Sequence, residues 1–146
     1  MKILVLSDTH SNEIRLDLKK YDFVIHCGDY GKSIDPHTQR DILFVKGNCD
    51  IYGPDLLELS IASKKVFVTH GYMENVKYGF DRLIYKALEK NCQICMFGHT
   101  HMQVCFLEEG ILFLNPGSYP EGYIEIFDEE IVLHQKNTIK KISYRW

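Results

Sequence analysis

The stretch Met96-Phe97-Gly98-His99-Thr100-His101 ends a mainly apolar run that begins at Cys92. In an extended chain, side chains two residues apart point the same way, so His99 and His101 would lie side by side. Gly98 lets the backbone approach a bound group closely. A single His-x-His motif is weak support for a metal site, because a histidine is more often a structural residue than a ligand. The stretch therefore needs support from the rest of the chain.

Four upstream stretches share this design, since each places an oxygen or nitrogen ligand at the carboxyl end of a short apolar run. In chain order they are Asp8-Thr9-His10 after residues 2–7, Gly28-Asp29 after 23–27, Gly47-Asn48 after 42–46, and His70-Gly71 after 66–69. Ligands in open α/β sheets gather at the carboxyl ends of the strands. The five stretches are therefore predicted to meet in one site.

The first hundred residues are predicted to alternate between strands and helices. Buried strands are expected over residues 2–7, 23–27, 42–46 and 94–97, and helices over 12–20 (with Ser11 as N-cap) and 79–90. Residues 31–40 are expected to form a loop, and a hairpin with its tip at 62–65 joins 57–61 to 66–69. From His101 onward the chain is predicted to be all-β, with strands at 104–107, 111–114, 123–127, 131–134 and 138–144. An α/β half followed by a β-rich half, with no linker, predicts two face-to-face sheets with helices outside, in a single domain 1–146.

Composition limits the class of protein. The net charge is −3 and no long basic cluster occurs, which argues against a partner such as long nucleic acid. The sequence has no run of about 18 apolar residues, so no membrane helix is predicted. The apolar N-terminus is too short for a signal peptide, so we expect a cytoplasmic protein. Five cysteines without a disulfide spacing fit free thiols. Cys92 and Cys95 are interpreted as core residues in preference to a redox or metal pair.

Taken in order, the motifs Asp-x-His, Gly-Asp, Gly-Asn, His-Gly and Gly-His-x-His resemble those of the calcineurin-like metallophosphoesterases. Gly47-Asn48-Cys49-Asp50 and Asn115-Pro116-Gly117-Ser118 narrow the resemblance to the family's small prokaryotic single-domain phosphodiesterases. The resemblance extends from Met1 to about Phe127. It implies a four-layer α/β/β/α sandwich of two mixed β-sheets flanked by helices.

The resemblance also implies a centre of two divalent metal ions. One ion would bind Asp8, His10 and His101, the other Asn48, His70 and His99, and Asp29 would bridge them. Carboxylate, amide and imidazole ligands suit Mn²⁺, which we expect first, and also Ni²⁺, Fe²⁺ or Zn²⁺, whereas Ca²⁺ prefers oxygen ligands only. A metal-bridging hydroxide would attack the phosphorus of a small phosphate-ester substrate, and two ions with two carboxylates leave a charge near +2 that favours an anionic substrate.

The expected catalytic residues are Asp29, Asn48, Cys49, Asp50 and His99, and Asn12 and Asn48 are expected to contact the substrate. In many relatives a histidine follows the metal-binding asparagine and protonates the leaving oxygen, helped by the next aspartate. Here Cys49 occupies that position, and a thiol suits the task less well than an imidazole near neutral pH. We therefore expect a preference for acidic leaving groups such as aryl alcohols, unless Cys49 only packs beneath the metals. Close relatives also often carry Pro and a basic residue where this chain has Pro120-Glu121, which puts the preferred substrate in doubt.

Three functions remain open from the sequence. The leading one is a phosphodiesterase that acts on small or nucleotide-like diesters, and a phosphomonoesterase is its close rival. The third is a protein-binding scaffold of the same fold, as in the retromer subunit of eukaryotes, but loss of the ligand set would then be expected and all seven ligands are present. The oligomeric state is left open, with a homo-oligomer as one outcome.

Overall fold

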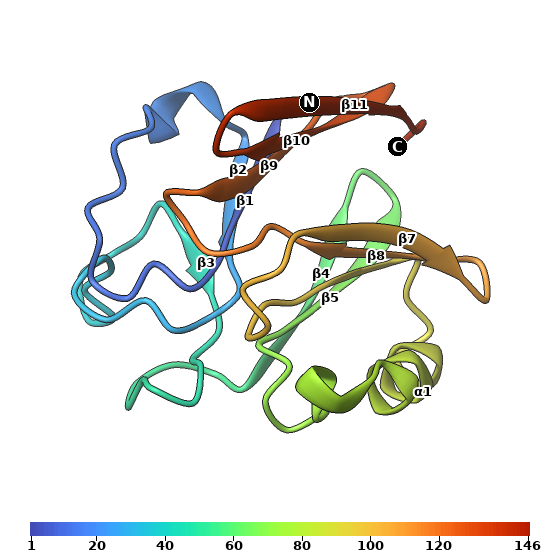
Figure 1. Ribbon diagram of the computed structural model, residues 1–146, viewed down its shortest axis with the longest axis horizontal. Coiled ribbons are helices and arrows are strands. Elements are labelled where there is room, and N and C mark those ends of the chain that lie inside the picture. The colour runs from blue at the N-terminus through green and yellow to red at the C-terminus, as the bar shows by residue number, and fades with distance from the viewer.

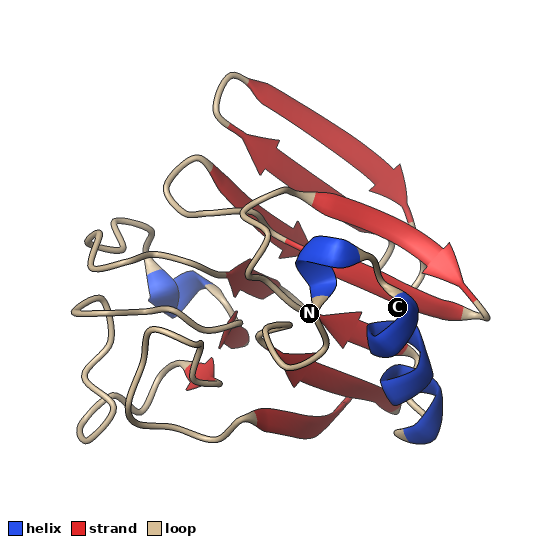
Figure 2. Cartoon of the chain, turned by 60° about the horizontal axis from the view of Figure 1, so that its bottom comes forward, coloured by secondary structure: helices blue, strands red, loops and turns tan.

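The computed structural model describes residues 1–146 and contains two mixed β-sheets packed face to face, one α-helix and two short 3-10 helices (Figures 1 and 2). The six-stranded sheet has the order β11-β10-β9-β1-β2-β3 and the five-stranded sheet β4-β5-β6-β8-β7. The strands of the first sheet are β1 (Ile3–Leu6), β2 (Phe23–His26), β3 (Leu43–Phe44), β9 (Gly122–Ile126), β10 (Glu130–Gln135) and β11 (Thr138–Ser143). Those of the second are β4 (Leu56–Ile61), β5 (Lys64–Thr69), β6 (Ile94–Met96), β7 (Val104–Glu108) and β8 (Ile111–Asn115). The helical elements are η1 (Leu18–Lys20), η2 (Val76–Tyr78) and α1 (Asp81–Glu89).

In the five-stranded sheet the parallel strands lie inside and antiparallel strands flank them, whereas in the six-stranded sheet the parallel strands form one side, which ends at β3, and the antiparallel strands form the other. β1, β2 and β3 pair in parallel, and β9 pairs antiparallel with β1. In the other sheet β5, β6 and β8 are parallel, while β4 and β7 add antiparallel edges. The predicted fold class, two packed mixed sheets of an α/β sandwich, is confirmed. No helix is long and apolar enough to cross a membrane.

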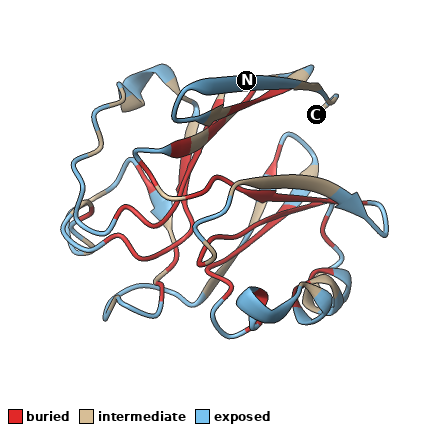
Figure 3. Cartoon of the chain, viewed as in Figure 1, coloured by how far each residue is buried: buried red, intermediate tan, exposed pale blue.

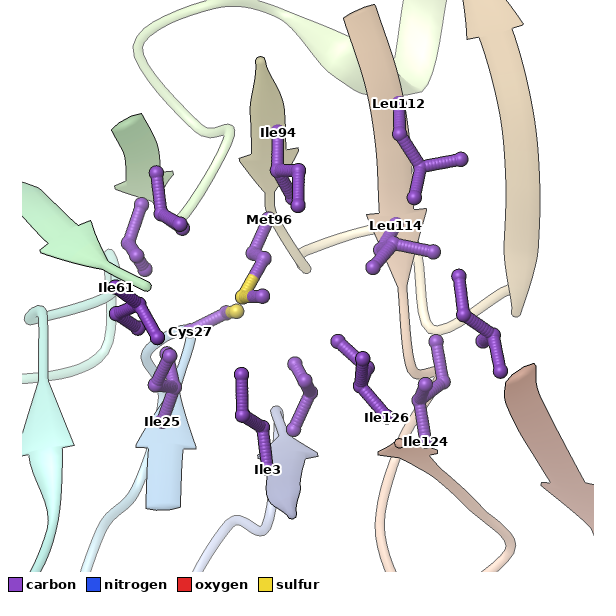
Figure 4. Packing of buried hydrophobic residues seen from close by; sticks show 14 of the residues in the cluster. Ile3, Ile25, Cys27, Ile61, Ile94, Met96, Leu112, Leu114, Ile124 and Ile126 are labelled. Atoms are coloured by element: carbon purple, nitrogen blue, oxygen red, sulfur yellow. The ribbon is translucent and has the colours of Figure 1, made fainter. Parts of the chain in front are cut away.

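The space between the sheets holds the largest apolar cluster, which comprises 16 buried residues (Figure 4). Because side chains alternate along a strand, Ile3 and Val5 point into this core while Leu4 and Leu6 pack on the outer face of the six-stranded sheet. All four are fully buried. A strand buried on both faces needs a continuous apolar sequence, which is what residues 3–6 supply.

The outer faces of the two sheets are covered differently. The helix α1 packs Leu83 and Ala87 against Phe67 and Phe113 of the five-stranded sheet. Irregular chain covers the six-stranded sheet, where Tyr30, Ile34 and other loop residues pack on Leu4 and Leu6. Figure 1 shows α1 below the five-stranded sheet, whereas loops lie beside β2 and β3.

The helix predicted over residues 12–20 is wrong, because only η1 forms there. Ile14, Leu16 and Leu18 are two residues apart, a spacing that does not build one helical face. All three pack on the outer cluster, Ile14 and Leu16 from irregular chain and Leu18 from η1. The Ser11 hydroxyl accepts a hydrogen bond from the Lys32 N–H (2.9 Å) and caps no helix. Asp17 instead caps η1 by accepting from the Lys19 N–H at 3.2 Å.

Two further boundaries differ from the prediction. The hairpin turn is two residues long, since Ala62 and Ser63 both have positive φ (44° and 69°) and β5 begins at Lys64. Of the strand expected over 42–46, only Leu43–Phe44 pairs with β2.

Cys92 and Cys95 are both buried in the cluster beneath α1, so their interpretation as core residues is confirmed.

Candidate metal centre

The segments that follow β1, β2 and β6 turn sharply as they leave the sheets. Asp8, His10, Asp29, His99 and His101 all have left-handed φ values, between 43° and 71°. This region is uncommon for residues other than glycine, and its clustering is typical of functional sites. In Figure 3 the buried colour continues past the strand ends into these loops. The turns bring polar side chains to one place that regular strands would have kept apart.

One cluster of candidate ligands contains Asp8, His10 and His101. The Asp8 Oδ1 atom lies 3.7 Å from His10 Nε2 and 3.3 Å from His101 Nε2. The two imidazole Nε2 atoms are 3.3 Å apart. The structure thus brings together the three residues expected to share the first ion.

A second cluster contains Asp29, His70 and His99. His70 Nε2 lies 3.2 Å from Asp29 Oδ2 and 3.0 Å from the amide oxygen of Asn48. The His70 and His99 rings are in edge contact, with centroids 5.1 Å apart. The remaining four candidates are therefore also together.

The two clusters adjoin through their carboxylates. Asp29 Oδ2 is 3.8 Å from His10 Nε2 of the first cluster, and Asp8 Oδ1 is 4.0 Å from His70 Nε2 of the second. Asp29 lies within reach of histidines on both sides, which is the position that a bridging carboxylate needs.

The chemistry of these atoms fits divalent cations. Asp8 Oδ1 is the one buried side-chain polar atom without a hydrogen-bond partner, and three histidine Nε2 atoms surround it. An uncompensated buried carboxylate oxygen is costly unless a cation meets it. Ligands that share one ion at bond lengths near 2.1 Å lie about 3 to 3.5 Å apart, close to the separations in the first cluster.

Outer hydrogen bonds orient the candidate ligands. His70 Nδ1 lies 2.7 Å from the Cys27 carbonyl oxygen, so Nδ1 carries the proton and Nε2 is free to bind a cation. The second Asp8 oxygen accepts from the Ser7 hydroxyl (2.5 Å) and from the His99 N–H (3.0 Å). Asp29 Oδ1 accepts from the Cys49 N–H at 2.8 Å. These contacts leave one oxygen of each aspartate facing the histidines.

At two positions beside the carboxylates only glycine fits, because a Cβ atom would clash with neighbouring atoms. A Cβ atom on Gly47 would lie 2.0 Å from Asp29 Oδ1, and one on Gly98 would lie 2.0 Å from the Ser7 hydroxyl oxygen. The backbone at Gly98 was expected to lie close to a bound group; in the structure it lies close to Ser7, whose hydroxyl holds Asp8.

The pKa shifts of Asp29 and His99 favour a charged carboxylate and a neutral imidazole, whereas the pKa of His70 is raised, because the lowering effect of burial is more than offset by Asp29 and Asp8. Burial raises the pKa of Asp29, but the contact with His70 and the hydrogen bond from the Cys49 N–H more than offset it and bring the pKa to about 2. Burial and the neighbouring His70 lower the pKa of His99. Both are the protonation states that bind metal ions.

The remaining predicted catalytic residues lie at the rim of the centre. Cys49 is exposed, and burial by its surroundings together with Asp29 raises the pKa of its thiol, which is therefore protonated at neutral pH. Asp50 accepts backbone N–H bonds from Asp29 (2.7 Å), Tyr30 (3.2 Å), Gly31 (3.2 Å) and Gly47 (2.8 Å). Its carboxylate thus fixes two ligand loops, and a part in catalysis remains a prediction.

Asn12 is exposed, and its amide nitrogen donates to the Thr9 carbonyl oxygen at 2.8 Å. This bond holds the side chain within its own loop. Contact between Asn12 and a substrate remains a prediction.

Sequence reasoning missed the buried residue His26. Its Nδ1 accepts from the Gly28 N–H (3.0 Å), so its Nε2–H donates to the Thr9 hydroxyl at 3.0 Å. The pair joins the loop that carries Asp8 and His10 to the loop that carries Asp29. No motif marks His26, because its partners are a backbone group and a hydroxyl from another strand.

A cleft of about 250 Å³ opens beside Asn48 and His70. Tyr72 and Met73 form its apolar wall, and the Tyr72 ring is in edge contact with His99. The other lining residues are polar: Lys46, Gly47, Asp50, Asp55, Thr69, Gly71 and Glu74. Glu74 is neutralised by Lys86 at 2.7 Å and Lys46 lies 3.6 Å from Asp55, so the wall carries little unpaired charge.

The family model for the calcineurin-like phosphoesterase superfamily domain matches residues 1–127. The chain belongs to this superfamily. The match includes every candidate ligand of the metal centre and ends just past β9.

Named relatives agree with this assignment. The chain is 34% identical over 126 residues to the probable metallophosphoesterase YsnB of Bacillus subtilis, covering 81% of this chain and 75% of the relative. It is 27% identical over 145 residues to phosphodiesterase MJ0936 of Methanocaldococcus jannaschii, covering 80% and 83%. The phosphoesterase superfamily thus includes relatives named as diesterases.

Solved structures share the fold. A predicted phosphoesterase from Streptococcus pneumoniae superposes with a TM-score of 0.80 at 30% identity and covers 98% of this chain and 97% of its own. Vacuolar protein sorting 29 from Cryptosporidium parvum superposes with a TM-score of 0.74 at 17% identity, covering 98% of both chains. At that identity the second likeness concerns the fold alone.

Proposed function

We propose that this protein is a metal-dependent phosphodiesterase that hydrolyses small or nucleotide-like phosphate diesters. The observation that carries the proposal is the buried, unpartnered Asp8 Oδ1 atom with three histidine Nε2 atoms around it. A structural role would have given this oxygen a hydrogen-bond donor, whereas a cation explains both the oxygen and the approach of the imidazoles.

The proposed ligands divide as the two clusters do. Asp8, His10 and His101 would hold one ion, and Asn48, His70 and His99 the other, with Asp29 between them. We expect Mn²⁺ first, because oxygen and imidazole ligands are mixed in the set. When bound, such ions activate a water molecule as nucleophile and offset the charge that develops on the phosphoryl oxygens.

The side chains of the rim would handle the leaving group. The protonated Cys49 thiol is the candidate proton donor for the leaving oxygen, and Asp50 fixes the loops that position it. The cleft beside Asn48 would take up the organic substituent, with Tyr72 and Met73 against its apolar part. A wall whose charges are paired favours a neutral polar substituent such as a nucleoside over a second phosphate.

Two alternatives give different outcomes in one assay. A phosphomonoesterase would prefer a dianionic phosphate, yet the cleft offers only Lys46 as a cation, and Asp55 is already beside it. A protein-binding scaffold would not need the buried Asp8 charge.

The test is hydrolysis of bis(para-nitrophenyl) phosphate and para-nitrophenyl phosphate by metal-stripped protein to which Mn²⁺, Ni²⁺, Zn²⁺ or Mg²⁺ is restored. We expect diester turnover with Mn²⁺ and a loss of more than about 100-fold in Asn48→Ala, because even outer partners of metal ligands commonly contribute 10- to 100-fold. Asn137→Ala, an exposed asparagine in the β10–β11 turn, is the matched control and should keep full activity. Faster monoester turnover would support the monoesterase, and no turnover with any metal would support the scaffold.

A further inference from the structure

Cys49 carries the one exposed thiol among the five free cysteines. Its Sγ atom, a ring nitrogen of His10 and a carboxylate oxygen of Asp29 all lie within 4.8 Å of one another. The Cys49 N–H bond to Asp29 and the contact of Sγ with the Asn48 amide nitrogen (3.7 Å) hold the thiol on this side of the centre. The three groups form a third set of possible metal ligands, which shares His10 and Asp29 with the proposed centre and adds a sulfur that the phosphoesterase function does not require.

A second observation at the same place points to a cation. Asp8 Oδ1, fully buried and without a partner, lies 3.7 Å from His10 Nε2. An ion that binds His10 would therefore also lie near this carboxylate oxygen. The sulfur of Cys49 would be an added ligand on the exposed side. Closing the 4.8 Å set to the spacing of shared ligands requires a shift of about 1 Å, which an exposed side chain with one rotatable bond permits.

We propose that Cys49 is a sulfur ligand that binds a thiophilic divalent ion, such as Zn²⁺ or Cd²⁺, together with His10 and Asp29. This inference rests on the metal centre of the proposed function. Soft thiolate ligands select zinc-like ions over Mn²⁺ and Mg²⁺, which favour oxygen. As the sulfur–metal bond forms, the S–H bond breaks and its proton passes to solvent.

The consequence is a choice between two states of the same residue. With Mn²⁺, which favours oxygen ligands, the sulfur stays unbound. With a thiophilic ion the sulfur would be bound and would cover the exposed side of the centre. Structural zinc sites are closed in this way, whereas catalytic sites keep a position open. Through Cys49, the metal that is bound would decide whether the centre is active or blocked.

The test is ultraviolet absorption of the metal-free full chain during titration with Cd²⁺ or Co²⁺, which reports sulfur-to-metal charge transfer without any substrate. We expect a saturating charge-transfer band in the wild type that is absent in Cys49→Ser. Cys105→Ser is the matched control, because Cys105 is half-buried on β7 and belongs to none of the ligand groups, and its band should persist. Competition should show Zn²⁺ affinity at least about tenfold weaker in Cys49→Ser, with Mn²⁺ affinity changed less than about threefold.

Absence of the band in the wild type, its persistence in Cys49→Ser, or its loss in Cys105→Ser would each overturn the inference. Failure of the proposed function is recognised separately. A chain that shows the Cys49-dependent band but hydrolyses no ester with Mn²⁺ keeps the sulfur ligand and loses the phosphodiesterase. A chain that hydrolyses diesters with Mn²⁺ but shows no band keeps the phosphodiesterase function and loses the sulfur ligand.

Discussion

The interior between the sheets and the loops at the carboxyl ends of the strands are built from the same segments in opposite ways. Residues 3–6 are fully buried, regular and apolar, and they pack alternately on the inner and the outer face of their sheet. A few residues later the chain has left-handed φ at Asp8, His10 and Ser11 and holds an unpartnered buried charge. In the strand interior every side chain is packed within the fold, whereas the loop after it leaves a buried carboxylate oxygen without a hydrogen-bond partner. Stability and function should therefore respond to different substitutions.

The largest expected effect is on activity, from Asp8→Asn. The amide keeps an oxygen for the Ser7 hydroxyl and the His99 N–H but removes the charge that faces three histidines. We expect Mn²⁺-supported diester hydrolysis to fall by about 10³-fold, or about 4 kcal/mol, from loss of metal. Urea unfolding of the metal-free protein should change by less than about 1 kcal/mol, because a buried unpaired charge is relieved. A loss of several kcal/mol in stability would remove the contrast between the two regions.

The converse change is Ile25→Ala in the interior. Ile25 is fully buried between the sheets, and truncation of such a side chain costs about 2–5 kcal/mol. Urea unfolding should report that loss, while kcat of the folded protein stays within about threefold. Ile139→Ala, 64% exposed on β11, is the matched control and should cost less than about 0.5 kcal/mol. A large drop in kcat for folded Ile25→Ala would mean that the interior also sets the geometry of the centre.

A pH effect is expected at the boundary between the two regions, where His26 lies. Burial lowers the pKa of His26 from 6.5 to about 3. Between these values the unfolded chain binds a proton that the folded chain does not, so the free energy of unfolding falls as pH falls, by about 1.4 kcal/mol per pH unit. The slope reaches this value only below pH 6.5, so the change from pH 6.5 to 5 amounts to about 1.6 kcal/mol. In His26→Gln the stability curve should be flatter by that amount, and an equal slope in the variant would contradict the assignment.

The smallest expected effect is a gain, from Cys49→His. An imidazole has a pKa near neutrality and is the better proton donor. The rate for diesters with alkyl leaving groups should rise about tenfold, or about 1.4 kcal/mol, whereas aryl diesters should change little. Stability should stay within about 0.5 kcal/mol because Cys49 is exposed. No gain with alkyl esters would leave Cys49 without a role in proton transfer.

The sequence predicted most of the strands and predicted that the candidate ligands meet, and one physical cause accounts for both. An apolar run such as residues 3–6 must be buried, and a polar residue directly after it must lie at the sheet edge. The helix under the five-stranded sheet was predictable because Leu83 and Ala87 follow the helical period, and both are buried there. Residues 12–20 do not follow that period, since Ile14, Leu16 and Leu18 alternate by two and share no helical face.

What the sequence could not show depends on contacts with the backbone and between distant loops. Asp50 follows the candidate ligand Asn48, which suggested chemistry, but its oxygens accept backbone N–H groups from two loops. His26 and Thr9 meet only because β1 and β2 pair in register. The proximity of Cys49 to His10 likewise depends on loops 39 residues apart in sequence folding to one edge.

The central claim is that seven side chains at the strand ends hold two metal ions. Its most direct test is an anomalous difference map from a crystal of the Mn²⁺-loaded protein. The account predicts two peaks, one among Asp8, His10 and His101 and the other among Asn48, His70 and His99, with Asp29 between them. A single peak, or peaks away from these residues, would contradict it.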